Sequence, residues 1–157
     1  ALHNLGFMLQ GLERLGEAEA CYQRALKLQP NDAETHNNLG TTFKDLGRSN
    51  EAAASYRRAL AINPNYADAH SNLGILLQDK GMLTDAEACY RRALQINPYY
   101  ASAFGNLLFC LSSKIGVEAQ ALFAEHVRFG EQFEAPLRSS WPQHNNHVDC
   151  WIVIPCG

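Results

Sequence analysis

The stretch Ala33–Pro64, AETHNNLGTTFKDLGRSNEAAASYRRALAINP, decides the fold of this chain. It predicts two short amphipathic helices and then a proline that cannot continue the second one. The pattern occurs three times. Its key residues recur at one fixed interval before and after this stretch, namely Asn38-Leu39-Gly40, Tyr56, Ala59-Leu60 and Pro64. The counterparts of Tyr56, for example, are Tyr22 and Tyr90. A period of roughly 34 residues is typical of a solenoid built from helix–turn–helix units.

The sizes of the repeated residues explain how such a unit packs. Gly40 and Ala52 let two helix backbones approach closely, Ala59 does the same against the next repeat, and Tyr56 fills the space between the helices with its hydroxyl near a polar edge. The pattern resembles the tetratricopeptide repeat family through Leu39, Gly40, Phe43, Ala52, Tyr56, Ala59 and Pro64, and through the equivalent residues of the other two repeats. The resemblance implies an all-α fold, a solenoid of antiparallel helix pairs that forms a right-handed superhelix.

The repeat phase divides the chain into five segments. We expect repeat one, truncated at its start, over residues 1–31, repeat two over 32–65, repeat three over 66–99, an atypical terminal unit over 100–136 and an irregular connector over 137–157. Helices are expected near 33–46, 50–62, 67–80 and 83–96, with Asp32 as an N-cap and tight turns at Gly47 and Gly81. Repeat one has Glu13 where those glycines stand, so we expect its turn to shift toward Gly11 or Gly16.

The terminal unit keeps the repeat phase at first and then departs from it. Leu108 replaces the small glycine, and Gln120 and Ala124 stand where alanine and tyrosine are expected. Residues 117–133 still predict one helix, with Leu122, Phe123, His126, Phe129 and Phe133 on a single stripe. We interpret this unit as the one that closes the array, since terminal repeats are commonly atypical.

Composition excludes several classes of function. The net charge of −3 gives no basic surface of the kind that nucleic-acid-binding proteins carry, and no apolar run reaches the roughly 18 residues of a membrane span. Cys21 and Cys89 share a repeat position with Ser55, which indicates small packing residues in a reducing, cytoplasmic compartment and no disulfide framework. The chain has no signal peptide and no initiator methionine, and begins inside a repeat, so we expect it to belong to a larger protein.

One asparagine per repeat precedes the Leu-Gly or Leu-Leu pair, at Asn4, Asn38, Asn72 and Asn106. On first helices that line a concave face, these residues would form a ladder of amides that both donate and accept hydrogen bonds to an extended peptide backbone. The alternative is that they satisfy neighbouring backbone or each other. Flanking candidates for the same protein-binding face are Asn37, Thr41, Lys44, Asp45, Ser71, Gln78 and Asp79, whose mixed chemistry specifies no ligand.

Other motifs have simpler interpretations. His36 and His70 share one repeat position and are expected to be packing histidines, and the arginine pairs Arg57-Arg58 and Arg91-Arg92 to lie on a solvated outer face. The grouping of His144, His147, Cys150 and Cys156 is a weak candidate for zinc, since no compact domain surrounds it. We expect no cofactor, and we find no phosphate-binding loop, nucleophile elbow or carboxylate pair in these 157 residues.

The end of the chain carries a second resemblance. Residues 106–112, 122–133 and 141–146 resemble the junction between the repeats and the catalytic domain in SPINDLY-type and bacterial O-linked N-acetylglucosamine transferase-like proteins. That resemblance implies a glycosyltransferase that moves a sugar from UDP-N-acetylglucosamine or a related donor to serine and threonine hydroxyls of proteins. The catalytic residues of that family lie downstream of the junction, and residues 150–157 do not match its continuation.

Three hypotheses follow from the sequence. The chain is the non-catalytic, substrate-recognising arm of such a transferase, or a stand-alone scaffold or adaptor that mediates protein–protein interaction, or, least favoured, a protein with a zinc-dependent tail. Repeat proteins that clamp a C-terminal carboxylate use lysine and arginine on the concave face. Here only Lys44 is available there, which argues against that mode. We also expect the repeats to allow homo-oligomers.

Overall fold

The computed structural model describes residues 1–114 and 119–135, which contain helices and turns and no strand. The helices are α1 (Leu2–Gly11), α2 (Leu15–Leu28), α3 (Ala33–Asp45), α4 (Ser49–Ile62), α5 (Ala67–Asp79), α6 (Leu83–Ile96), α7 (Ala101–Ser113) and α8 (Ala119–Phe129), followed by a π-helical turn, η1 (Gly130–Glu134). The helices expected in repeats two and three are confirmed to within one residue at each end.

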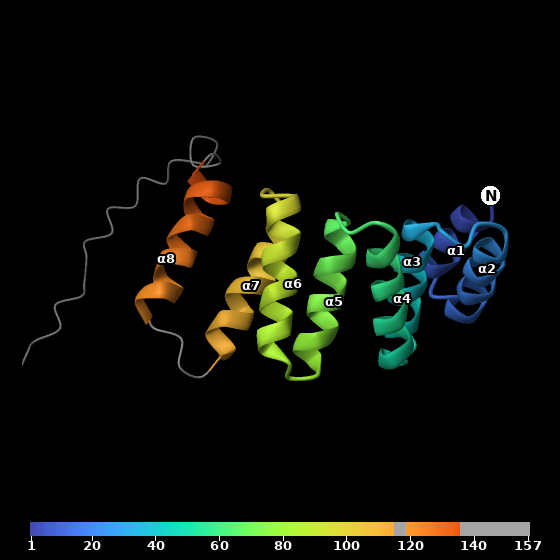
Figure 1. The fold of residues 1–157 in the computed structure, drawn as a ribbon, viewed down its shortest axis with the longest axis horizontal. Helices are drawn as coiled ribbons and strands as arrows, with labels where there is room; N and C mark the ends of the chain where they lie inside the picture. Colours follow the sequence, from blue (N-terminus) through green and yellow to red (C-terminus); the bar gives the residue numbers. More distant parts are fainter. Residues whose placement is uncertain (115–118, 136–157) are drawn as a thin grey trace, which may run out of the picture.

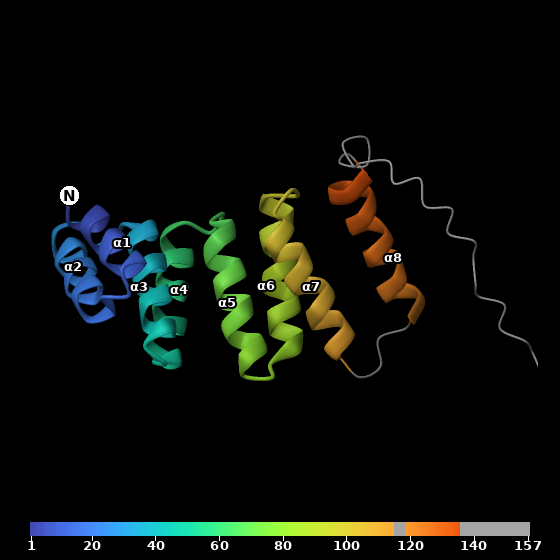
Figure 2. The same cartoon turned by 180° about the vertical axis from the view of Figure 1, so that it is seen from behind.

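The helices form pairs that are stacked along one direction. Figures 1 and 2 show α1 and α2 at one end of the array and α8 at the other, with the intervening helices following in chain order. Each pair packs against the next, α2 against α3, α4 against α5 and α6 against α7. This is the solenoid of helix pairs that the sequence predicts. None of the helices in residues 1–114 and 119–135 is both long and apolar enough to cross a membrane.

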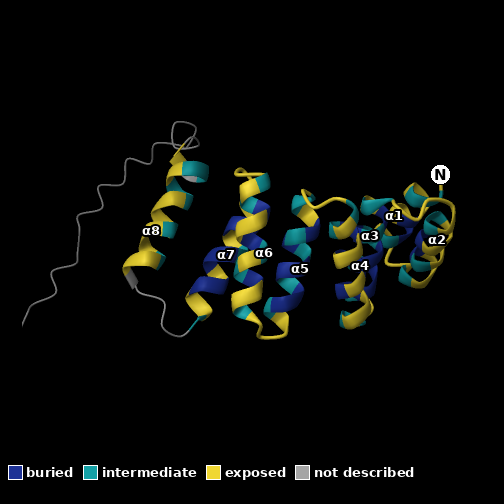
Figure 3. Ribbon diagram, viewed as in Figure 1, coloured by how far each residue is buried: buried dark blue, intermediate teal, exposed yellow. Residues whose placement is uncertain are grey.

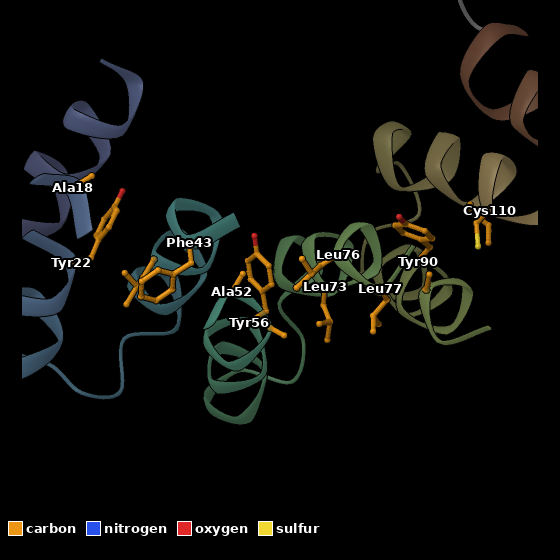
Figure 4. Close-up of a cluster of buried hydrophobic side chains, with 14 of the residues drawn as sticks. Ala18, Tyr22, Phe43, Ala52, Tyr56, Leu73, Leu76, Leu77, Tyr90 and Cys110 are labelled. Atoms are coloured by element: carbon orange, nitrogen blue, oxygen red, sulfur yellow. The ribbon is translucent and has the colours of Figure 1, made fainter. Parts of the chain in front are cut away.

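A tyrosine packed against a glycine closes each of the first three helix pairs. Tyr22, Tyr56 and Tyr90 are completely buried between their helices (Figure 4). A Cβ atom added to Gly40 would lie 2.7 Å from Cε1 of Tyr56, and the same distance is found at the other two pairs. Glycine is therefore required where the ring meets the backbone of the first helix. The Tyr56 hydroxyl donates to Thr41 Oγ1 at 3.3 Å, so the ring also reaches the polar edge that the sequence predicts.

The turns within each repeat share one backbone conformation. Gly47 and Gly81 have φ of 75° and 74°, in the left-handed region that favours glycine. Glu13 has φ of 59°, so repeat one makes the same turn with a side chain in that unfavourable region. The expectation that this turn shifts toward Gly11 or Gly16 is wrong, because the close packing of α1 on α2 fixes the turn even without glycine. Asp32 caps α3 as predicted and accepts from the backbone amides of Glu34 and Thr35.

The terminal unit is closed by phenylalanines. The ring of Phe104 lies 5.4 Å from that of Phe129 and 5.8 Å from that of Phe133, both edge to face. The predicted helix is present but ends as α8, and Phe133 lies in the wider turn η1. The single stripe is only partly correct, because Phe123 is 70% exposed and His126 is also exposed. Leu122, Phe129 and Phe133 are half-buried, so the buried face of this unit is narrower than the predicted stripe.

Polar contacts join each repeat to the next. Arg48 donates to Glu19 at 2.7 Å, and Lys114 donates to Glu87 at 2.6 Å. Two further arginines donate to the asparagine after the preceding proline, Arg58 to Asn31 at 3.2 Å and Arg92 to Asn65 at 2.9 Å. The ring Nε2 atoms of His36 and His70 lie 2.9 Å and 3.0 Å from the carbonyl oxygens of Pro30 and Pro64. These contacts agree with the expected packing role of the histidines. With the hydrogen bond that Arg91 donates to Glu125 at 3.1 Å, three of the four arginines expected on the outer face link neighbouring repeat units.

Candidate peptide-binding groove

A groove of about 630 Å³ runs across the first helices of the repeats. Its lining comes from α1, α3 and α5 and from the residues that precede α5 and α7, and none comes from a second helix. The lining residues are Phe7, Gln10, Gly11, Glu34, Asn37, Asn38, Thr41, Asp45, Tyr66, Asp68, Asn72 and Tyr100. This is the surface on which the sequence analysis places the asparagine ladder.

Three asparagine amides are linked at the centre of the groove. Asn72 Nδ2 on α5 donates to Asn37 Oδ1 on α3 at 3.0 Å, and Asn37 Nδ2 donates to Asn38 Oδ1 at 3.4 Å. The alternative that these residues satisfy each other is therefore partly correct. Each amide still has capacity to spare, since an asparagine offers two donor hydrogens and two acceptor lone pairs. Within the described part of the chain, Asn38 Nδ2 and Asn72 Oδ1 have no hydrogen-bond partner, so the network orients the amides and leaves polar atoms for a ligand.

Tyrosines and carboxylates surround the amides. Burial, together with the nearby Asp68, Glu34 and Asp32, raises the pKa of Tyr66 to about 12. Burial and the adjacent Asp68 likewise raise the pKa of Tyr100. Both hydroxyls therefore keep their protons at neutral pH and can act as hydrogen-bond donors. The lining contains three carboxylates, from Glu34, Asp45 and Asp68, and neither lysine nor arginine, so the groove is electronegative.

The remaining predicted residues are placed differently. Thr41 and Asp45 line the groove; Thr41 Oγ1 accepts from Tyr56, and Asp45 accepts from Gln10 Nε2 at 3.3 Å. Ser71 is only 2% exposed and does not line the groove. Among the other candidates, Gln78 accepts from the Tyr90 hydroxyl at 3.2 Å. The structure does not place Asn4, Asn106, Lys44, Gln78 or Asp79 in the lining either.

Sequence reasoning missed seven residues of the lining, Phe7, Gln10, Gly11, Glu34, Tyr66, Asp68 and Tyr100. The spacing of the repeats could have indicated four of these residues as groove residues. Glu34 and Asp68 lie four residues before Asn38 and Asn72, a separation that places side chains on one helix face. Tyr66 and Tyr100 occupy the same position in successive repeats, two residues after the turn-forming Pro64 and Pro98.

Metal binding has no support in the described region. Residues 1–114 and 119–135 contain no group of three metal-ligand side chains. The weak zinc candidates His144, His147, Cys150 and Cys156 lie outside the described residues, as does the connector from residue 137 onward. Cys21, Cys89 and Cys110 are free thiols, and Cys21 and Cys110 are buried.

The chain belongs to the tetratricopeptide repeat family. Family models described as tetratricopeptide repeat match residues 1–65 and residues 67–100, which together cover the three regular repeats. A search of curated protein sequences gave no significant match. Protein binding through the repeats is thus the class of function that the fold and the family define.

Solved structures show how widely this architecture occurs. A mutant O-GlcNAc transferase of Thermobaculum terrenum is 25% identical with a TM-score of 0.79, over 87% of this chain and 26% of that one. MamA is 21% identical with a TM-score of 0.77, over 91% of this chain and 76% of that one. The first repeat domain of Spaghetti (RPAP3), solved with the HSP90 peptide SRMEEVD, is 22% identical with a TM-score of 0.69, over 71% of this chain and 89% of that one. The last two likenesses concern the fold alone, and this chain spans about a quarter of the transferase.

Proposed function

We propose that the groove binds an extended segment of a partner protein, with the amides of Asn38 and Asn72 contacting its backbone. The observation that carries the proposal is the linked amide network in a groove lined by first helices and by the residues that precede α5 and α7. Amide contacts to a peptide backbone do not depend on the ligand's side chains, so this part of recognition tolerates many sequences. Each bond contributes about 0.5–1.5 kcal/mol, which makes the interaction weak unless several are formed.

The negative charge of the groove disfavours acidic peptides as ligands. Three carboxylates line it without a lysine or arginine, so a peptide rich in acidic residues would be repelled. We therefore expect neutral or basic segments to bind better than a peptide such as SRMEEVD, which the RPAP3 domain binds. This electronegative lining disfavours the carboxylate-clamp mode, and leaves other adaptor roles as the second candidate function.

The test is a binding screen on an array of immobilised, unstructured peptides. We expect the double variant Asn38→Ala/Asn72→Ala to bind roughly tenfold more weakly than wild type across many sequences, since two backbone contacts are lost. Asn50→Ala, on the exposed side of α4 and outside the groove, is the matched control. Unchanged binding by a correctly folded double variant would contradict the proposal.

We further propose that the chain serves as the substrate-recognising arm of an O-GlcNAc transferase-like protein in the cytoplasm. Support comes from the junction-like residues 106–112, 122–133 and 141–146 and from the likeness to the Thermobaculum terrenum transferase over 87% of this chain. In that role the groove would hold an acceptor protein while a separate catalytic domain transfers the sugar. Detection of the native protein with an antibody against the repeats tests this, because a species much heavier than 17.4 kDa with sugar-transferase activity is expected, and a species of 17.4 kDa would contradict it.

A further inference from the structure

The first helices carry a row of apolar side chains beside the asparagine amides. Phe109 on α7 occupies the same repeat position as Ile75 on α5, Thr41 on α3 and Phe7 on α1. Phe7 and Thr41 line the groove, and Ile75 is half-buried. This repeat position therefore extends the face of the groove as far as α7. We call Phe7, Ile75 and Phe109 the apolar row.

Phe109 puts a large apolar side chain on the exposed face of α7. Exposed residues recur at intervals of three and four along this helix, which places them on one face, namely Ser102, Gly105, Phe109 and Ser112. The other sides of α7 are packed, since Cys110 Sγ donates to the Leu83 carbonyl of α6 at 3.2 Å and the ring of Phe104 lies 5.4 Å from that of Phe129 on α8. Figure 3 shows both a buried and an exposed side on α7. The 62% exposure of Phe109 is therefore a property of the groove-facing side and of no packing side.

The surroundings of the Phe109 ring leave room for a ligand. Gly105 lies about one helical turn before it, and a Cβ atom added there would have no neighbour from the described residues within 4 Å beyond its own helix backbone. The hydroxyls of Ser112 and Ser113 donate to the Phe109 carbonyl at 2.8 Å and 2.9 Å, so both are bonded to the helix backbone. A ligand side chain that covers the ring would remove apolar surface from water, which favours binding.

Carboxylates lie on the same helices, on the other side of the amides. Glu34 and Asp68 each precede the repeat position of the apolar row by seven residues, which corresponds to about 10 Å along a helix. The linked asparagine amides lie between these two positions in the sequence of each helix. The third carboxylate of the groove, Asp45, already accepts from Gln10. The first helices therefore present an acidic band, an amide band and an apolar band, in that order.

The three bands specify the chemistry of one kind of ligand. We propose that the groove takes an extended segment of a partner protein in which basic and apolar side chains alternate, with the apolar ones packed on the apolar row; this inference rests on the proposed function of the groove. Successive side chains of an extended chain point to opposite sides. Basic residues can then face Glu34 and Asp68 while apolar residues face Ile75 and Phe109, and the backbone lies over the amides between them. The carboxylates select by charge complementarity, and Phe109 selects for a large apolar side chain.

The experiment uses two fluorescently labelled synthetic peptides of identical composition. One repeats the unit Arg-Leu-Ser-Ser, which places arginine and leucine on opposite sides of an extended chain. The other repeats the unit Arg-Ser-Leu-Ser, which places both on one side of an extended chain and on opposite sides of a helix. We expect anisotropy titrations with the whole chain to show tighter binding of the first peptide.

A matched pair of variants tests the apolar row. Phe109→Ser should weaken binding of the first peptide by roughly three- to tenfold, because the contact between leucine and the ring is lost, and should change binding of the second peptide little. Phe123→Ser, at a 70% exposed phenylalanine of α8 outside the groove lining, is the control and should bind both peptides as wild type does. Both phenylalanines are exposed, so both variants should keep the fold, which circular dichroism checks.

Several results would overturn the inference. They are equal binding of the two peptides by wild type, tighter binding of the second peptide, which would indicate a helical ligand, equal effects of Phe109→Ser and Phe123→Ser, and no binding of either peptide. The proposed function fails separately, because Asn38→Ala/Asn72→Ala should weaken both peptides alike through lost backbone contacts. Binding that depends on Phe109 and not on these asparagines would contradict the backbone contacts and support the apolar row.

Discussion

Repeat two and the terminal unit solve the same packing problem with different residues. In repeat two, Gly40 lets α3 approach α4 so closely that the ring of Tyr56 lies directly against its backbone. In the terminal unit, Leu108 and Ala124 stand at those positions, and the contact between α7 and the following segment is made by Phe104, Phe129 and Phe133. The difference is between one large side chain set into a glycine gap and several rings packed edge to face.

The two units also differ in how many helix pairs they contact. Repeat two has a helix pair on each side, and its buried residues belong to a core shared along the array. The terminal unit has a described neighbour on one side only, and much of α8 is exposed (Figure 3). In a solenoid, stability is the sum of each repeat and its interfaces with adjacent repeats. A defect in repeat two should therefore spread to both neighbours, whereas a defect in the terminal unit should stay local.

The largest expected loss of stability comes from removing a buried aromatic side chain, which we compare between repeat two and the terminal unit. Tyr56→Ala should lower the free energy of unfolding by about 3–5 kcal/mol, because it empties a completely buried site. Phe129→Ala, at a half-buried site, should cost roughly 1–2 kcal/mol. Urea unfolding followed by circular dichroism measures both, and equal losses would contradict the proposed difference between an internal and a terminal unit.

A matched pair of glycine substitutions comes next. Gly40→Ala should destabilise the protein by about 1–3 kcal/mol, because the new Cβ would lie 2.7 Å from the Tyr56 ring. Gly105→Ala on α7 should stabilise it by about 0.5–1 kcal/mol, since a Cβ there meets nothing within 4 Å and alanine favours the helix. Thermal unfolding of both variants should give shifts of opposite sign, and a neutral Gly40→Ala would mean that Tyr56 can move away.

The smallest expected change in stability concerns the residue that precedes the first helix of each unit. Asp32 caps α3 with its side chain, whereas Tyr100, which precedes α7, makes no such bond. Asp32→Ala should cost about 1 kcal/mol at neutral pH. Asp85→Ala, in the first turn of α6 and not at a cap, is the control and should cost only a few tenths of a kcal/mol.

The loss of stability caused by Asp32→Ala should depend on pH. Burial alone would raise the pKa of Asp32, but hydrogen bonds from Thr35 and Glu34 and the nearby His3 bring it below its ordinary value of 3.8. A carboxyl group whose pKa is lowered by folding stabilises the protein above its unfolded pKa and loses that contribution as the pH falls through the folded one. The difference between wild type and Asp32→Ala should thus be constant near neutrality and shrink below about pH 4. A difference that grows in acid would contradict this.

The repeat phase, the helices and the residues that close each regular pair could be predicted from the sequence. Gly40, Tyr56 and Pro64 act through local sizes and backbone preferences, so the fixed repeat period was enough to place them. It also placed Asn38 and Asn72 on the first helices, on the face where the structure has its groove.

Which of these residues contact one another depends on the tertiary structure. The link from Asn72 to Asn37, the inclusion of Tyr66 and Tyr100 in the groove and the burial of Ser71 all depend on how far one helix pair is rotated against the next. The same holds for Glu13, which keeps a left-handed turn because α1 and α2 are already packed. Local pattern specifies which residues are large, small or polar, but contacts between repeats arise from the geometry of stacking, which no single repeat encodes.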